Sequence, residues 1–84
     1  MVVYSDNYVM LRVEPVKLPT GIVPFIHCEV LEYSKNVKQT VEAVVKTLGR
    51  IYALADTPKL TKFASLVGGT VVKQTPVGNV LRFN

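Results

Sequence analysis

His27, Cys28 and Glu29 are the residues of this 84-residue chain whose types and spacing could perform chemistry. They are consecutive within an apolar run that predicts a β-strand, and side chains alternate between the two faces of a strand. His27 and Glu29 therefore share one face as a candidate polar pair for acid–base chemistry, whereas Cys28 points to the other face. This alternation disfavours a Cys–His nucleophile pair. A hydrogen-bonded structural pair near the end of the sheet is the interpretation that we favour for His27 and Glu29.

The sequence lacks the ligands that a metal site needs. Zinc sites use three or four clustered ligands, and this chain has one histidine, one cysteine and scattered carboxylates. The single cysteine excludes an internal disulfide, and we expect it to be a small buried hydrophobic side chain. We therefore predict no metal site.

The first third of the chain predicts strands. A short arm at residues 2–4 precedes a strand at residues 8–14, which a proline ends. A turn at residues 17–21 leads to a second long strand, residues 22–31, whose near-continuous apolar character predicts burial on both faces. Because Pro24 removes a backbone donor from that strand, we expect a bulge or a splayed pairing there.

The middle of the chain predicts a helix that begins at Asn36. Asn36 and Gln39 have the spacing of a capping box, and Gly49 lies where a left-handed residue ends a helix. The apolar stripe recurs at three- and four-residue intervals and consists of Val37, Val41, Val44, Val45 and Leu48.

A second strand–helix unit follows. Residues 50–55 predict a short strand in a parallel position, after which Thr57 caps a helix with Pro58 in its first turn. The buried stripe of that helix consists of Leu60, Phe63, Ala64 and Val67. We expect truncation of Phe63 to unfold the protein, since a buried phenylalanine contributes ~3–5 kcal/mol.

The predicted elements follow the order β-β-β-α-β-α-β-β. Residues 70–74 and 80–83 complete it as a hairpin, and residues 80–83 offer an exposed edge. The order predicts an α/β fold, in which a mixed β-sheet of five to six strands carries two helices within one domain, residues 1–84.

Two stretches of sequence, together with this element order from residue 8 onwards, resemble a known family. One runs from Val30 to Gln39, and the other is Phe63-Ala64-Ser65-Leu66-Val67-Gly68-Gly69. They are similar to the second half of the GNAT superfamily of acyl-CoA N-acyltransferases, so that the chain looks like a truncated, degenerate member. Within that family the chain looks like the small phage-encoded relatives, and this resemblance implies a phage-encoded or virion-associated protein.

The resemblance places the coenzyme-binding loop at the start of the first helix. In the family, backbone N–H groups of a glycine-containing loop hold the coenzyme A pyrophosphate. The glycine positions fall on Val37 and Gln39, where a Cβ would crowd the phosphate. Lys35 and Lys38 could attract phosphate more loosely, although two solvated lysines are the interpretation that we favour. Any weak cofactor binding would involve these four residues.

The resemblance also places the catalytic tyrosine, which protonates the leaving thiolate, on the second helix. Phe63 and Gly68 match the aromatic and glycine positions of that motif, but the tyrosine position falls on Ala64. Alanine has no proton to give, and the neighbouring Ser65 is a poor acid at neutral pH. We therefore expect no catalytic residue.

Composition bears on partners and location. The formal net charge is +4 and the pI is about 9.4, which invites a nucleic-acid interpretation. The lysines are dispersed along the sequence, however, so we favour solvation and expect low affinity for nucleic acid. Hydrophobic residues make up 49% of the chain, which favours self-association or a protein partner. Without a long apolar run or a secretory signal, we expect a cytoplasmic or intravirion protein that is neither membrane-bound nor secreted.

The functional hypothesis is a non-catalytic GNAT-like protein that acts by protein binding or assembly. One alternative is an acyl-CoA-dependent N-acyltransferase that is active as an oligomer and uses acetyl-CoA. A second alternative is a basic nucleic-acid-binding module. Under the main hypothesis we expect no bound cofactor.

Overall fold

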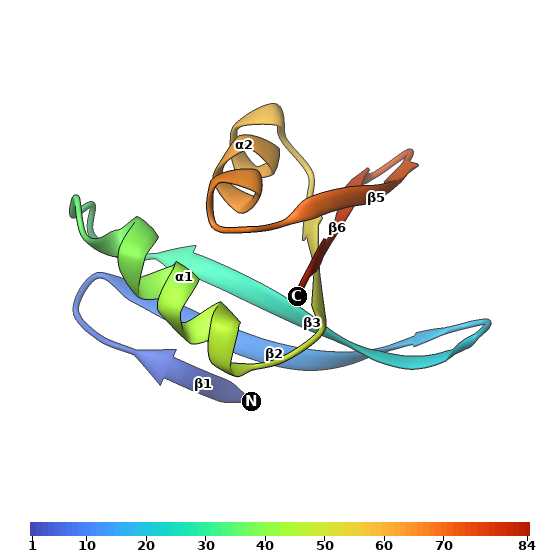
Figure 1. Ribbon diagram of the computed structural model, residues 1–84, viewed down its shortest axis with the longest axis horizontal. Helices are drawn as coiled ribbons and strands as arrows, with labels where there is room; N and C mark the ends of the chain where they lie inside the picture. The colour runs from blue at the N-terminus through green and yellow to red at the C-terminus, as the bar shows by residue number, and fades with distance from the viewer.

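The computed structural model describes all 84 residues and has six strands and two helices in the predicted order. The elements are β1 (Val2–Ser5), β2 (Val9–Leu18), β3 (Gly21–Val30), α1 (Val37–Thr47), β4 (Ile51–Ala55), α2 (Pro58–Leu66), β5 (Thr70–Thr75) and β6 (Gly78–Phe83). All strands belong to one sheet in the order β1-β2-β3-β4-β6-β5 (Figure 1). β3 and β4 are parallel, and every other neighbouring pair is antiparallel. The predicted α/β fold with a mixed sheet is confirmed.

The β2–β3 hairpin is longer and more regular than the sequence predicts. Its ladder runs through ten consecutive pairs without a shift in register, and Pro15 lies directly opposite Pro24. Because neither proline can donate, this pair is one of the non-hydrogen-bonded pairs that alternate along an antiparallel ladder. The nitrogens of both prolines therefore point away from the partner strand, and the ladder loses no bond.

The expected bulge at Pro24 and the expected strand end at Pro15 are therefore wrong. The N–H of Val13 lies on the same edge of β2 as the Pro15 nitrogen and donates outward to the carbonyl oxygen of Met1 at 2.8 Å. The hairpin loop shortens to residues 19–20, because Leu18 pairs with Gly21. Both prolines also remove an outward donor from the edges of this arm, which hinders strand addition by another molecule.

Helix α1 forms around its predicted valine stripe. Val37, Val41 and Val45 are buried, and Gly49 has the predicted left-handed conformation with φ of +73°. The predicted capping box is wrong, because no side chain caps this helix. The backbone at Asn36 is already helical, with φ of −91° and ψ of −5°, whereas a capping residue is normally extended.

Helix α2 begins as predicted. Thr57 is extended, and its Oγ1 accepts a hydrogen bond from the N–H of Leu60 at 3.1 Å. Pro58 occupies the first turn, where no intrahelical donor is needed.

Both helices cover the same face of the sheet. Their buried side chains form one hydrophobic cluster with inward-facing strand residues, namely Val9, Leu11, Ile26, Val37, Val41, Val45, Ile51, Ala55, Ala64, Val67, Leu81 and Phe83. No polar or charged side chain is buried. The expectation that β3 is buried on both faces is wrong, since Ile26 is its only buried residue.

The other face of the sheet carries no helix, and we call it the open face. Its residues alternate with the core residues along each strand and are aligned by the strand register. The central residues of the open face are Arg12, Glu14, Phe25, His27, Tyr52, Leu54, Val80 and Arg82.

The C-terminal hairpin presents β5 as an edge of the sheet, not residues 80–83 as predicted. β6 runs between β4 and β5, and its Leu81 and Phe83 are buried. β5 is exposed along most of its length and has a register shift between Val71 and Lys73. A shift of this kind twists an edge away from further pairing. Neither helix combines the length and the apolar character needed to cross a bilayer.

Candidate functional site

The two parallel strands in the centre of the sheet pair at one position only. Phe25 on β3 is aligned with Tyr52 on β4, and beyond this pair the strands diverge (Figure 1). Fully paired parallel strands would exchange evenly spaced hydrogen bonds along their length. The divergence instead leaves a cleft of about 450 Å³, which is within the size range of ligand pockets.

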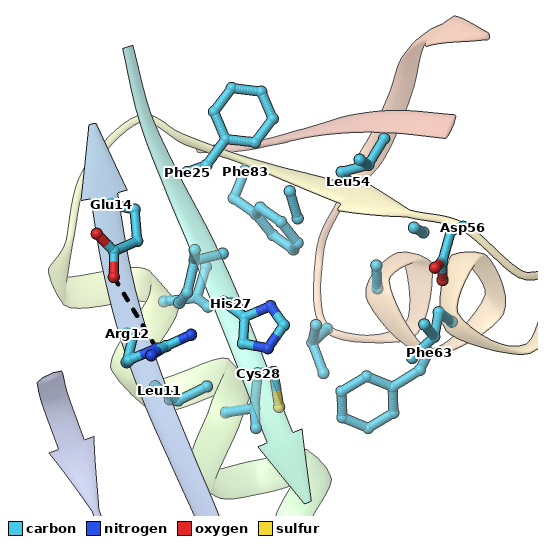
Figure 2. Close-up of a pocket in the computed structure, with 18 of the residues that line it drawn as sticks. Leu11, Arg12, Glu14, Phe25, His27, Cys28, Leu54, Asp56, Phe63 and Phe83 are labelled. Carbon is cyan, nitrogen blue, oxygen red and sulfur yellow. Dashed lines mark ion pairs between the residues drawn. The ribbon is translucent and has the colours of Figure 1, made fainter. Parts of the chain in front are cut away.

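The cleft is apolar and reaches from the helices to the open face. Fifteen of its 19 lining residues are hydrophobic. Val41 of α1 and Phe63 of α2 line it on the helical side, and Arg12 and His27 line it on the open face. Figure 2 shows Phe63 across the cleft from Cys28 on β3. The cleft therefore suits an apolar group that enters between the diverging strands β3 and β4.

His27 and Glu29 share the open face, as their spacing predicts. Both are exposed, and no hydrogen bond joins them. Across the ladder, His27 faces Arg12 and Glu29 faces Met10. The predicted hydrogen-bonded pair is therefore absent, and the two side chains do not form an acid–base unit.

Cys28 points to the helical side and is half-buried at the wall of the cleft. Burial raises the pKa of its thiol, which favours the protonated, weakly nucleophilic form. The prediction of a small hydrophobic role agrees with this environment.

The start of α1 does not form an open phosphate loop. Val37 is buried, with 6% of its surface exposed, so its side chain belongs to the core. Its N–H donates to the carbonyl oxygen of Ser34 at 3.1 Å, and the N–H of Asn36 donates to Ser34 Oγ at 3.3 Å. Two backbone donors of this turn are thus bonded within the chain. The other positions named from the sequence, Lys35, Lys38 and Gln39, are exposed.

The position that the resemblance assigns to a catalytic tyrosine is part of the core. Ala64 is buried, and its carbonyl oxygen accepts a hydrogen bond from the N–H of Gly69 at 2.9 Å. Ser65 beside it is exposed. No side chain that could give a proton therefore enters the cleft from this turn of α2.

Sequence reasoning missed the cleft, although it identified Cys28, Phe63 and Ala64 individually. No sequence signal shows that β3 and β4 pair only once. The structure contains no group of three or more His, Cys, Asp or Glu side chains placed to bind a metal ion. Comparisons with family models, curated proteins and solved structures gave no match to this chain.

Proposed function

We propose that this protein acts without catalysis, by binding a protein partner through the cleft between β3 and β4. The observation that carries the proposal is a cleft of about 450 Å³ with a predominantly hydrophobic lining. Its polar lining residues do not form a pair suited to proton transfer or nucleophilic attack.

The rim of the cleft supports a protein partner. Leu54 on β4 and Leu60 on α2 line the cleft, and each is 47% exposed. A partner that inserts an apolar side chain would remove both leucines from water, at about 25 cal/mol per Å² of apolar surface. An aliphatic or aromatic anchor in such a pocket is the usual centre of a protein interface.

The acyl-CoA alternative uses the same cleft and is favoured by one observation. Where β3 and β4 diverge, an extended ligand could lie between them. The buried Val37 and Ala64 oppose this alternative, because one occupies a phosphate-loop position and the other the acid position that the GNAT resemblance assigns. We therefore place the acyltransferase second.

Calorimetry with acetyl-CoA separates the two functions. We expect no measurable heat at concentrations up to about 1 mM, which corresponds to a binding free energy weaker than about −4 kcal/mol. A dissociation constant in the low micromolar range, together with acetyl transfer to an amine, would overturn the non-catalytic proposal.

Site-specific crosslinking identifies the partner. A photoreactive residue at Leu60 should give one defined protein adduct in the native cells, whereas the same residue at Lys46 on the exposed surface of α1 should not. The recombinant partner should then bind the wild-type chain, and Leu60→Asp should weaken binding at least tenfold. Equal binding to Leu60→Asp and wild type would contradict a role for the cleft.

A further inference from the structure

A row of paired residues crosses the open face and has aromatic rings at its centre. Glu14, Phe25, Tyr52, Arg82 and Thr70 are aligned in succession on β2, β3, β4, β6 and β5. The ring centroids of Phe25 and Tyr52 are 5.9 Å apart, and the ring planes are inclined by 31°. Since no helix covers this face, the two rings form part of an accessible β-sheet surface.

Basic side chains lie on both sides of these rings. Arg82 pairs with Tyr52, and Arg12 lies in the adjacent row opposite His27. Lys73 on β5 pairs with Val80 and therefore shares the open face. Arg50 is exposed two residues before Tyr52. The three arginines of the chain thus lie on or beside the face that carries the aromatic pair.

These cations are free to bind a ligand. None of their side chains donates a hydrogen bond within the protein. The closest carboxylate is that of Glu14, whose Oε1 is 4.0 Å from Arg12 Nε. Arg12 Nε is shielded from solvent and has no hydrogen-bond partner. Its ion pair with the half-exposed Glu14 side chain is long, so it holds the guanidinium only weakly.

Two carboxylates also lie on the open face. Glu14 is within 3.8 Å of the N-terminal amine as well as close to Arg12, so two cations offset its charge. Glu29 lies at the end of β3, opposite Met10 and beyond His27. The region from Arg12 to Arg82 therefore keeps a positive balance.

We propose that the open face binds single-stranded nucleic acid. Phe25 and Tyr52 provide stacking surfaces for unpaired bases, and Arg12 and Arg82 bind the phosphates on either side. Three strand spacings separate β2 from β6, or about 14 Å, which suits about two to three bases. The net charge of +4 would favour the approach of a polyanion. A duplex would not bind in this way, because its bases are already stacked on each other.

This site is argued independently of the protein partner in the cleft. Arg12, Phe25 and His27 border both sites, but Tyr52, Lys73 and Arg82 belong to the open face alone. The two proposals can therefore fail separately.

Fluorescence anisotropy with labelled 12-nucleotide oligothymidylate and oligouridylate tests the proposal. Arg12→Gln combined with Arg82→Gln should weaken binding about tenfold. It should also make the slope of log affinity against log salt concentration shallower, by the equivalent of about one to two phosphate contacts. The control, Lys46→Gln combined with Lys59→Gln, removes the same charge from the two helices and should change affinity less than twofold. Tyr52→Leu should weaken binding about tenfold, and Tyr52→Phe should retain it.

The outcomes are distinct. Binding that is lost equally in the lysine control, or that is as tight for a duplex of the same length, would overturn the proposal. Absence of binding to both oligonucleotides at about 100 µM protein and about 50 mM salt would also overturn it. A different oligomeric state of the double arginine variant in the absence of nucleic acid would overturn the proposal as well, since the open face would then be an interface between copies. Thermal melts confirm that every variant compared is folded.

Discussion

The side-chain amide of Asn84 donates to the carbonyl oxygen of Val45, with 2.9 Å between the two atoms. The same nitrogen lies 2.5 Å from the carbonyl oxygen of Gly49. The Val45 carbonyl oxygen also accepts the N–H of Leu48 at 3.1 Å in the last turn of α1, and Asn84 supplies a second donor from 39 positions away. This contact attaches the end of α1 to the strand β6 that precedes Asn84.

Asn84→Ala should therefore destabilise the protein. It removes two hydrogen bonds, although the Val45 carbonyl keeps the N–H of Leu48, and we expect a loss of about 1–2 kcal/mol in the free energy of unfolding. Asn36→Ala is the matched control at the other end of α1, where no side-chain cap exists, and should change stability by less than about 0.5 kcal/mol. Urea denaturation measures both. Equal losses would show that the Asn84 contact contributes nothing specific.

The stability of the β1–β2 connection should depend on pH through Asp6. The hydroxyl of Tyr4 donates to Asp6 Oδ2 at 2.7 Å, and the N–H groups of Tyr8 and Val9 donate to Oδ1 at 2.7 and 2.9 Å. The Tyr4 bond first, and then the two backbone bonds, lower the pKa of the Asp6 carboxyl below its usual value. The same contact raises the pKa of the Tyr4 hydroxyl.

The direction of the Asp6 effect follows from linkage. A carboxyl with a lowered pKa in the folded state stabilises the protein above the unfolded-state pKa of about 3.9, and this contribution disappears as pH falls through the folded-state pKa. Asp6→Asn keeps an acceptor for both backbone N–H groups but removes the titration. Its unfolding free energy should therefore fall less than that of wild type between pH 5 and pH 2, measured by urea denaturation. Parallel curves would contradict the assignment.

The helices were predictable from the sequence because their signals lie within a few neighbouring residues. The valine spacing of α1 and the Thr57–Pro58 start of α2 depend on residues within one or two helical turns, and both predictions are confirmed. Pro24 shows the opposite case. Its effect on the ladder depends on which way its nitrogen points, and this depends on its pairing with Pro15. A proline in a strand does not reveal that direction by itself.

The candidate sites are less predictable because they arise from distant residues. The cleft depends on β3 and β4 pairing only at Phe25 and Tyr52, which are 27 positions apart. Likewise, the sequence argument against nucleic acid considered the dispersed lysines, most of which lie on the helices. Arg12 and Arg82 are 70 positions apart and come to one face only through the strand order.

Two hairpin glycines should differ in their tolerance of alanine. Gly21 and Gly78 have φ of +136° and +146°, so a side chain at either position is strained. A Cβ at Gly21 would meet no atom within 4 Å, whereas one at Gly78 would lie 2.5 Å from the carbonyl oxygen of Ala55. Gly21→Ala should therefore lose about 1–2 kcal/mol, and Gly78→Ala at least about 1 kcal/mol more, because the β4 backbone must also move. Urea denaturation of the two variants provides the comparison. Equal losses would mean that β6 does not approach β4 so closely.

Truncation of Leu81 should destabilise the protein more than truncation of Phe63. The sequence argument placed Phe63 among the fully inward residues, but in the structure it is only partly buried and lines the cleft. Leu81 on β6 belongs to the hydrophobic core and is fully buried, at 0% exposure. Leu81→Ala leaves a closed cavity and should lose about 3–4 kcal/mol, most of the stability of so small a domain. Phe63→Ala enlarges a cleft that is already open, and its free energy of unfolding should fall by about 1–2 kcal/mol because less surface returns to water.

Thermal melts resolve the two variants, because each kcal/mol corresponds to about 4–8 °C in melting temperature for a domain of this size. If Phe63→Ala melts as low as Leu81→Ala, the cleft is closed around Phe63 and cannot receive a partner.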